Sequence, residues 1–141
     1  MAKVSGADRH KQRLRKLMGA EASRRITAAL YAGGQQIEIE AERSITEGSV
    51  SGKGHVPSRP GQPPNADTRL LDQSIETEIP ANRGPYDGRV DVTSNAPYAA
   101  FLEFGTSKMD ARPYMKPATR KKRRVVKDMV QAALSNIVRQ S

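Results

Sequence analysis

The fold is decided by the stretch Pro97-Tyr-Ala-Ala-Phe-Leu-Glu-Phe-Gly-Thr-Ser-Lys-Met-Asp-Ala-Arg-Pro-Tyr-Met-Lys-Pro-Ala118, which holds four of the chain's six aromatic residues. Pro97 suits the first turn of a helix, where its missing N–H has no partner to lose. The residues that follow make the richest apolar cluster of the chain, and most of them are spaced for one helical face: Tyr98, Phe101, Leu102 and Phe104. The pattern predicts a short helix here.

Gly105 stands where a left-handed residue would close that helix. Arg112 and Lys116 each precede a proline and are therefore biased toward extended backbone. Pro117 can open the final helix. We therefore expect a short helix, then an ordered connecting segment from Gly105 to Lys116, which we call the crossing, and then the start of a second helix.

Glu103 lies among the apolar residues of the short helix, where an unpaired buried carboxylate would be costly. Arg112, nine residues later, is the obvious partner, and their ion pair would tie the short helix to the crossing. A solvent-facing Glu103 is the alternative that helical geometry permits. The sequence leaves both open.

Two motifs within this stretch resemble the signature of phage neck and tail-completion proteins. They are Tyr-Ala-Ala-Phe-Leu-Glu-Phe-Gly-Thr-Ser at 98–107 and Ala-Arg-Pro-Tyr-Met-Lys-Pro-Ala at 111–118. The resemblance continues upstream in Arg-Pro-Gly-Gln-Pro-Pro at 59–64 and Asp-Thr-Arg-Leu-Leu-Asp-Gln-Ser-Ile at 67–75, and it covers roughly residues 20 to 138. One departure is visible, because the family commonly has glycine after the threonine and this chain has Arg69.

The resemblance implies a structural virion protein of the neck of long-tailed, double-stranded DNA phages. Such a protein forms a ring, expected to be a hexamer, between the head-completion or connector proteins and the tail terminator or tail tube, and DNA passes through its lumen. It would be assembled in the host cytoplasm and reside in the virion neck. The motif residues are then expected to serve packing or subunit contact: Tyr98, Phe101, Glu103, Phe104, Gly105, Thr106, Arg112, Pro113, Tyr114 and Pro117.

The composition limits the number of domains, the size of the core and the kinds of covalent or membrane anchoring that we expect. A chain of 141 residues is the size of one domain, and 36% hydrophobic residues without Trp is thin for a self-sufficient core. Either a small core carries long solvated loops, or protomers complete their burial against copies of themselves. The lack of Cys excludes disulfides, and no apolar run approaches the ~20 residues that span a bilayer. With no signal-peptide core near Met1, we expect a soluble protein kept inside a cell until assembly.

The net charge of +9 draws the chain toward polyanions, of which DNA is the usual one. A solvated basic surface, or acidic neighbours in an assembly, would fit as well. The cations gather near the start of the final helix, where their charge interacts unfavourably with the helix macrodipole. An anion would compensate this charge, and it could come from DNA, from a neighbouring subunit or from the chain's own glutamates. They are Arg120, Lys121, Lys122, Arg123, Arg124 and Lys127.

The chain divides into four parts within one domain, 1–141. Residues 1–19 form a basic arm or short helix, and residues 20–47 carry one apolar stripe of a long helix. The Gly33-Gly34 pair in that helix indicates a kink, a close crossing or simple tolerance. Residues 48–66 form an extended Gly/Pro loop, and loops of that length are usually functional or disordered. We expect it to reach a neighbouring subunit through Lys53, His55, Arg59, Pro60, Gly61, Pro63 and Pro64.

Residues 67–141 supply a sheet, the aromatic helix and the final helix. Asp67 or Thr68 can cap a short helix. The alternating runs 75–79 and 89–93 predict a β-hairpin, and a third strand could come from 111–115. The inward candidates are Ile75, Ile79, Val90 and Val92. With a last helix over 117–138, the sequence predicts an α+β fold whose two long helices pack on a small, mainly antiparallel sheet.

No enzymatic pattern emerges, and we expect neither a cofactor nor a metal site. His10 and His55 have no acidic residue at metal-ligand spacing, and the glycines at 48–54 lack the spacing and the hydroxyl of a phosphate-binding loop. Glu38, Glu40 and Glu42 indicate a solvated helix face. The rival interpretation is a sequence-independent nucleic-acid-binding protein; within the phage class, a tail terminator or head-completion protein also fits.

Overall fold

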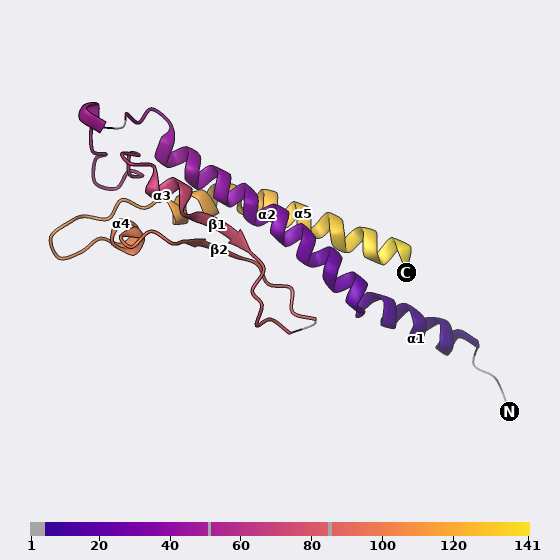
Figure 1. The fold of residues 1–141 in the computed structure, drawn as a ribbon. Helices are drawn as coiled ribbons and strands as arrows, with labels where there is room; N and C mark the ends of the chain where they lie inside the picture. The colour runs from indigo at the N-terminus through magenta and orange to yellow at the C-terminus, as the bar shows by residue number, and fades with distance from the viewer. Residues whose placement is uncertain (1–4, 51, 85) are drawn as a thin grey trace.

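The computed structural model describes residues 5–50, 52–84 and 86–141, and it confirms an α+β fold that is mostly helical (Figure 1). The strands form a small two-stranded antiparallel sheet. Both long helices begin and end within a few residues of the boundaries expected from the apolar periodicity. The elements in chain order are α1 (Ser5–Leu17), α2 (Ala20–Thr46), the 3₁₀ turn η1 (Gly52–Gly54), α3 (Leu70–Gln73), β1 (Ile75–Glu78), β2 (Asp91–Ser94), α4 (Ala99–Phe104) and α5 (Met115–Gln140).

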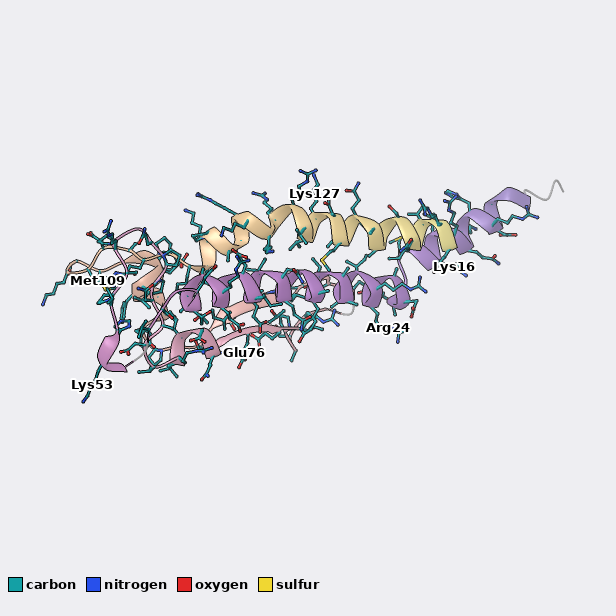
Figure 2. The ribbon with its side chains drawn as sticks, turned by 90° about the horizontal axis from the view of Figure 1, so that it is seen from above. Lys16, Arg24, Lys53, Glu76, Met109 and Lys127 are labelled. Atoms are coloured by element: carbon teal, nitrogen blue, oxygen red, sulfur yellow. The ribbon has the colours of Figure 1, made fainter. Side chains whose placement is uncertain are left out.

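The long helix α2 is the middle layer, with α5 along one side and the β-hairpin on the other (Figure 2). The adjacent glycines Gly33 and Gly34 face these two neighbours. A Cβ added at Gly33 would lie 2.9 Å from Val126 Cγ1 of α5, and one added at Gly34 would lie 2.7 Å from Thr77 Cγ2 of β1. The glycine pair therefore marks a close crossing, on both faces of the helix at once.

The hairpin pairs β1 with β2 in antiparallel register, with Ile75 opposite Ser94 and Glu78 opposite Asp91. The prediction that Ile79 points inward was wrong, because β1 ends at Glu78 and Ile79 is 44% exposed. Pro80 has no N–H to donate and cannot continue the ladder. The third strand expected at 111–115 is absent as well, since residues 111–113 are irregular and Met115 already begins α5.

The buried core is small, in keeping with the low share of hydrophobic residues, and most of its members are alanines. Tyr114 and Ile45 are its largest fully buried side chains, and around them lie Leu71, Ile75 and a set of buried alanines. The Tyr114 hydroxyl donates to Ser94 Oγ at 3.0 Å, and burial raises the pKa of Tyr114. Many large apolar side chains of the described residues remain exposed instead, among them Phe101 and Phe104.

The two ends of the molecule differ. The helix α1 and the last turns of α5 lie at one end, where α1 extends past the end of α5, while the Gly/Pro loop and the turn after α4 lie at the other (Figure 1). Residues 1–4 of the predicted basic arm lie outside the described residues; from Ser5 the arm is helical.

The start of α3 differs from expectation at one residue. Neither Asp67 nor Thr68 caps the helix; the N-cap is Arg69, whose φ of 64° is left-handed. Among the described residues it is the one non-glycine with positive φ. Glycine adopts this conformation without steric penalty, which explains why the resembling family commonly has glycine here. Arg69 Nε donates to Asp72 Oδ2 at 2.8 Å, a contact that glycine could not make.

Candidate functional site

The carboxylate of Glu103 joins the aromatic helix α4 to the start of α5. Its Oε2 accepts from the backbone N–H groups of Tyr114 (2.8 Å) and Met115 (3.0 Å), and its Oε1 accepts from that of Lys116 (2.9 Å). Of the two possibilities that the sequence left open, the ion pair with Arg112 is not formed within the described residues, and Glu103 is half-buried rather than facing solvent. The first N–H groups of a helix lack intrahelical partners and carry partial positive charge. The carboxylate of Glu103 binds these N–H groups at the start of α5 instead of pairing with the guanidinium of Arg112.

The short crossing between α4 and α5 is held by backbone contacts. Gly105 closes α4 with φ 76° and ψ 177°, a positive φ but not the helical left-handed conformation expected. A Cβ there would lie 2.9 Å from Ala111 N. Thr106 and Met109 form an isolated antiparallel bridge, and Arg112 N–H donates to Leu102 O at 2.6 Å. The helix itself starts at Ala99, two residues beyond Pro97, which lies in the preceding turn.

The two motif regions, far apart in sequence, meet around one groove at this end of the molecule. We call it the motif groove; its volume is about 350 Å³. The Gly/Pro loop contributes Pro57, Ser58 and Pro64, and the segment 65–72 supplies another wall. The lining from α4 and the crossing consists of Tyr98, Leu102 and Arg112.

Three buried polar atoms of the motif groove have no hydrogen-bond partner within the described chain: Ser58 Oγ, Asp72 Oδ1 and Arg112 Nε. Ser58 is 9% exposed and Asp72 only 3%. A buried polar group left without a partner typically costs about 1 to 3 kcal/mol. The groove therefore offers a donor and acceptors that a further polar group could satisfy.

The predicted neighbour-reaching loop is anchored at several points. Gly61 N–H donates to Ala111 O at 2.9 Å, Ala66 N–H donates to Ile45 O at 2.9 Å, and Asn65 Nδ2 donates to Val56 O. Pro64 is buried, and Pro63 is half-buried. The loop residues that project into solvent are Lys53, Arg59, Pro60 and Gly61, while His55 lines the groove. Contact with a neighbour through them stays a prediction.

The aromatic motif residues lie on the outside of α4. Phe104 is 81% exposed, Phe101 is 56% exposed, and Tyr98 at the rim of the groove is 37% exposed. Thr106 is exposed as well, whereas Pro113 and Pro117 are half-buried and Tyr114 belongs to the core. Exposed large aromatic side chains that cluster on one short helix are typical of protein–protein contact sites.

Two of the basic residues on α5 are paired within the chain. Lys121 Nζ lies 2.8 Å from Glu40 Oε1 of α2, and Lys122 Nζ lies 3.9 Å from Glu40 Oε2. The hydrogen bond from Lys121 lowers the pKa of Glu40 despite its burial. Across the described residues, no ion pair involves the remaining exposed cations of this cluster: Arg120, Arg123, Arg124 and Lys127.

The glutamates of α2 do not form the solvated face that their sequence suggested. Glu40 is buried against α5, while Glu38 accepts a hydrogen bond from Thr77 Oγ1 of β1 at 2.5 Å. Burial, followed by the charges of Glu38 and Asp72, raises the pKa of Glu42. Sequence reasoning missed Asp72 and Ser58; the signal for Asp72 was its position three residues after Arg69, the spacing of a helical ion pair.

Within 5–50, 52–84 and 86–141 no group of His, Cys, Asp or Glu is arranged to hold a metal ion. In the same ranges no helix has the length and apolar character to cross a membrane. What the geometry provides is a small anchored fold with a groove, exposed aromatic side chains and unpaired charges on its surface. Features of this kind are typical of proteins that act by contact with other macromolecules.

Residues 8–105 match the family whose description reads "Bacteriophage HK97-gp10, putative tail-component", and the chain belongs to this HK97-gp10-like family. The match includes the loop motif and the aromatic helix. No curated protein and no solved structure shows significant similarity to the chain. The family points to a structural, non-enzymatic phage component that resides in the virion.

Proposed function

We propose that this protein is a ring-forming component of the phage neck, joining the DNA-filled head to the tail. Head-completion or connector proteins would contact one side of the ring and the tail terminator or tail tube protein the other. The ring is expected to be a hexamer, with a lumen through which DNA passes.

The motif groove is the observation that carries this proposal. The family motif regions at 59–75 and 98–118 line one groove, in which the buried atoms Ser58 Oγ, Asp72 Oδ1 and Arg112 Nε lack hydrogen-bond partners within the described residues. The exposed Phe101 and Phe104 lie on the adjoining helix α4. A neighbouring polypeptide can supply both missing contacts at once, because its backbone carries donors and acceptors and its side chains bury aromatic rings.

The positive charge supports passage of DNA. The described part of α1 has five cations and one acid, and its charged side chains are exposed. No ion pair joins these cations to the rest of the described chain. A helix of this kind, projecting from the body, suits weak contact with phosphates that does not depend on sequence and weakens steeply with salt.

Native mass spectrometry of the full chain, alone and mixed with tail components, tests the ring. We expect a closed oligomer of defined stoichiometry in at least one of the two settings. A monomer that persists in both would contradict the proposal.

The net charge of +9 also favours a second candidate, a sequence-independent nucleic-acid-binding protein. DNA titration at low and moderate salt separates the two. Tight binding by the monomer, with a steep salt slope that falls when Arg120, Arg124 and Lys127 are replaced by Gln, would favour this candidate. A ring that binds DNA only weakly would favour the neck protein. A tail terminator or head-completion role would differ in the neighbour that the ring captures.

A further inference from the structure

The outer faces of the three-layered body carry opposite charges. Because α2 is the middle layer, the side of α5 and the side of the hairpin that face away from it lie on opposite sides of the molecule. Figure 2 shows the labelled Lys127 and Glu76 on these two sides. Charge separated in this way can make a protein complementary to a copy of itself.

The acidic face belongs to β1. Its side chains alternate, so Ile75 and Thr77 point toward α2 while Glu76 and Glu78 are exposed on the outer face. Asp91, opposite Glu78 in the register, is already neutralised by two hydrogen bonds from Arg89, at 2.9 and 2.8 Å. Glu76 and Glu78 have no ion pair within the described residues, so this face holds two carboxylates without counter-charges.

The basic face belongs to α5. Arg120, Arg124 and Lys127 recur at intervals of four and three residues, which places them on one side of the helix. The side that packs on α2 carries Val126 and Ile137 instead. All three cations are exposed, and none belongs to an ion pair within the described chain. Further along the same side, Leu134 and Val138 are 44% and 46% exposed.

We propose that the basic side of α5 in one copy binds the acidic face of β1 in the next copy. This contact rests on the proposed ring and names the surfaces that would build it. Residues four apart on a helix are separated by about 6 Å along its axis, and residues two apart on a strand by about 6.8 Å. Arg120 and Arg124 can therefore face Glu76 and Glu78 pair by pair.

The contact joins two different surfaces of the same chain, so it is heterologous. Contacts of this type run head to tail and close into a ring when the rotation between copies permits. Isolated exposed ion pairs contribute little to the free energy of binding. The proposed contact therefore also includes the exposed apolar residues beside both faces, which are Val125, Leu134 and Val138 on α5 and Ile79 after β1. DNA could compete for the basic side but would leave the acidic face without a partner.

Charge reversal on each face tests the contact. The variants are E76K/E78K and R120E/R124E, compared with wild type by sedimentation velocity over a range of protein concentrations, with circular dichroism as the check of folding. Each reversed face meets its own sign of charge, and we expect self-association to weaken about 100-fold, because like charges at an interface oppose binding by several kcal/mol. Mixing the two variants restores complementarity at both contacts, so we expect assembly with alternating copies.

Matched controls carry the same change in net charge elsewhere. K11E/R15E on α1 equals R120E/R124E in charge, and D8K/D110K equals E76K/E78K. Both controls replace exposed residues that belong to no ion pair within the described chain, and in the absence of DNA they should assemble like wild type.

The outcomes separate this contact from the ring itself. A wild-type ring unchanged by either reversal, or a mixture that stays dissociated while both variants are folded, overturns the contact and leaves the ring standing. Wild type that stays monomeric, alone and with tail components, overturns both.

Discussion

The centre of α2 and the motif end of the molecule are built in opposite ways. At Gly33 and Gly34, α5 and the hairpin approach α2 so closely that a single added methyl group would meet side-chain atoms at 2.9 and 2.7 Å. At the motif end, Phe104 is 81% exposed, and three buried polar atoms have no hydrogen-bond partner among the residues that the structure describes. The protomer is therefore closely packed along the centre of α2, whereas the end that carries the family motifs keeps exposed aromatic side chains and unsatisfied polar atoms.

The largest effect is expected where the motif end depends on one side chain. Replacing Glu103 with Ala removes the acceptor of three backbone N–H groups, and we expect the free energy of unfolding to fall by about 3 kcal/mol. Urea denaturation measures it. Glu103→Gln is the matched control, since it keeps one oxygen but loses the charge near the start of α5, and should lose less. An E103A variant as stable as wild type would mean that the motif end does not depend on this carboxylate.

One added methyl group at Gly34 tests how closely the hairpin packs against α2. We expect Gly34→Ala to lower the free energy of unfolding by about 2 kcal/mol, because overpacking against Thr77 exceeds the roughly 1 kcal/mol that Ala gains in helix propensity. Adding Thr77→Ser removes the methyl group that the new Cβ meets at 2.7 Å and keeps the hydroxyl that bonds Glu38. The double variant should recover part of the loss. A stabilised single variant would show that the crossing is loose.

The ion pair between the two long helices has a pH signature. In the folded protein the pKa of Glu40 lies below its ordinary value of 4.5, so its contribution to stability is fully present above pH 4.5 and is lost as pH falls through the folded pKa. We expect Glu40→Gln to cost about 1.5 kcal/mol at pH 7. The difference from wild type should shrink below pH 4.5, and urea denaturation at several pH values measures it. A difference that does not change with pH would exclude the carboxylate charge as its cause.

Arg69 sharpens the comparison at the groove wall. Gly and Ala at this position both lose the contact with Asp72, so the difference between R69G and R69A isolates the backbone conformation. With φ at 64°, we expect R69G to be more stable than R69A by about 1 kcal/mol, measured by thermal or urea unfolding. Equal stabilities would mean that the turn relaxes when the side chain changes.

The smallest effect on stability is expected at the open surface. Phe104→Ser should change the free energy of unfolding by no more than about 0.5 kcal/mol, because the ring is already in solvent. The same variant should weaken capture of tail components in a pull-down assay. Tyr86→Ser, at an aromatic residue that is 70% exposed and lies outside the motif end, is the control for general loss of exposed apolar surface. If F104S unfolds early, the side chain serves the fold rather than a partner.

The sequence predicted well what local pattern determines. Apolar periodicity located α2 and α5, and alternation located both strands. The left-handed backbone at Arg69 was not predicted, because the sequence suggested Asp67 or Thr68 as the cap of α3. What it could not predict depends on contacts across the fold. Glu103 and Arg112 looked like partners by charge, but the backbone N–H groups of α5 reach the carboxylate instead.

Burial was the second failure of local pattern. Ile79 alternates correctly, yet the strand stops before Pro80 and leaves its side chain outside. Glu38, Glu40 and Glu42 looked solvated because nothing in the sequence says that α2 is covered on two sides. The motif groove also needed the structure, since its walls come from segments tens of residues apart.

A cryo-electron microscopy reconstruction of the intact virion tests the central claim most directly, that this protomer is completed by its neighbours. We expect density for the chain at the head–tail junction, as a closed ring in which the motif groove and Phe104 are covered by another polypeptide. A single copy, a position away from that junction, or a ring with the groove open to solvent would contradict the account.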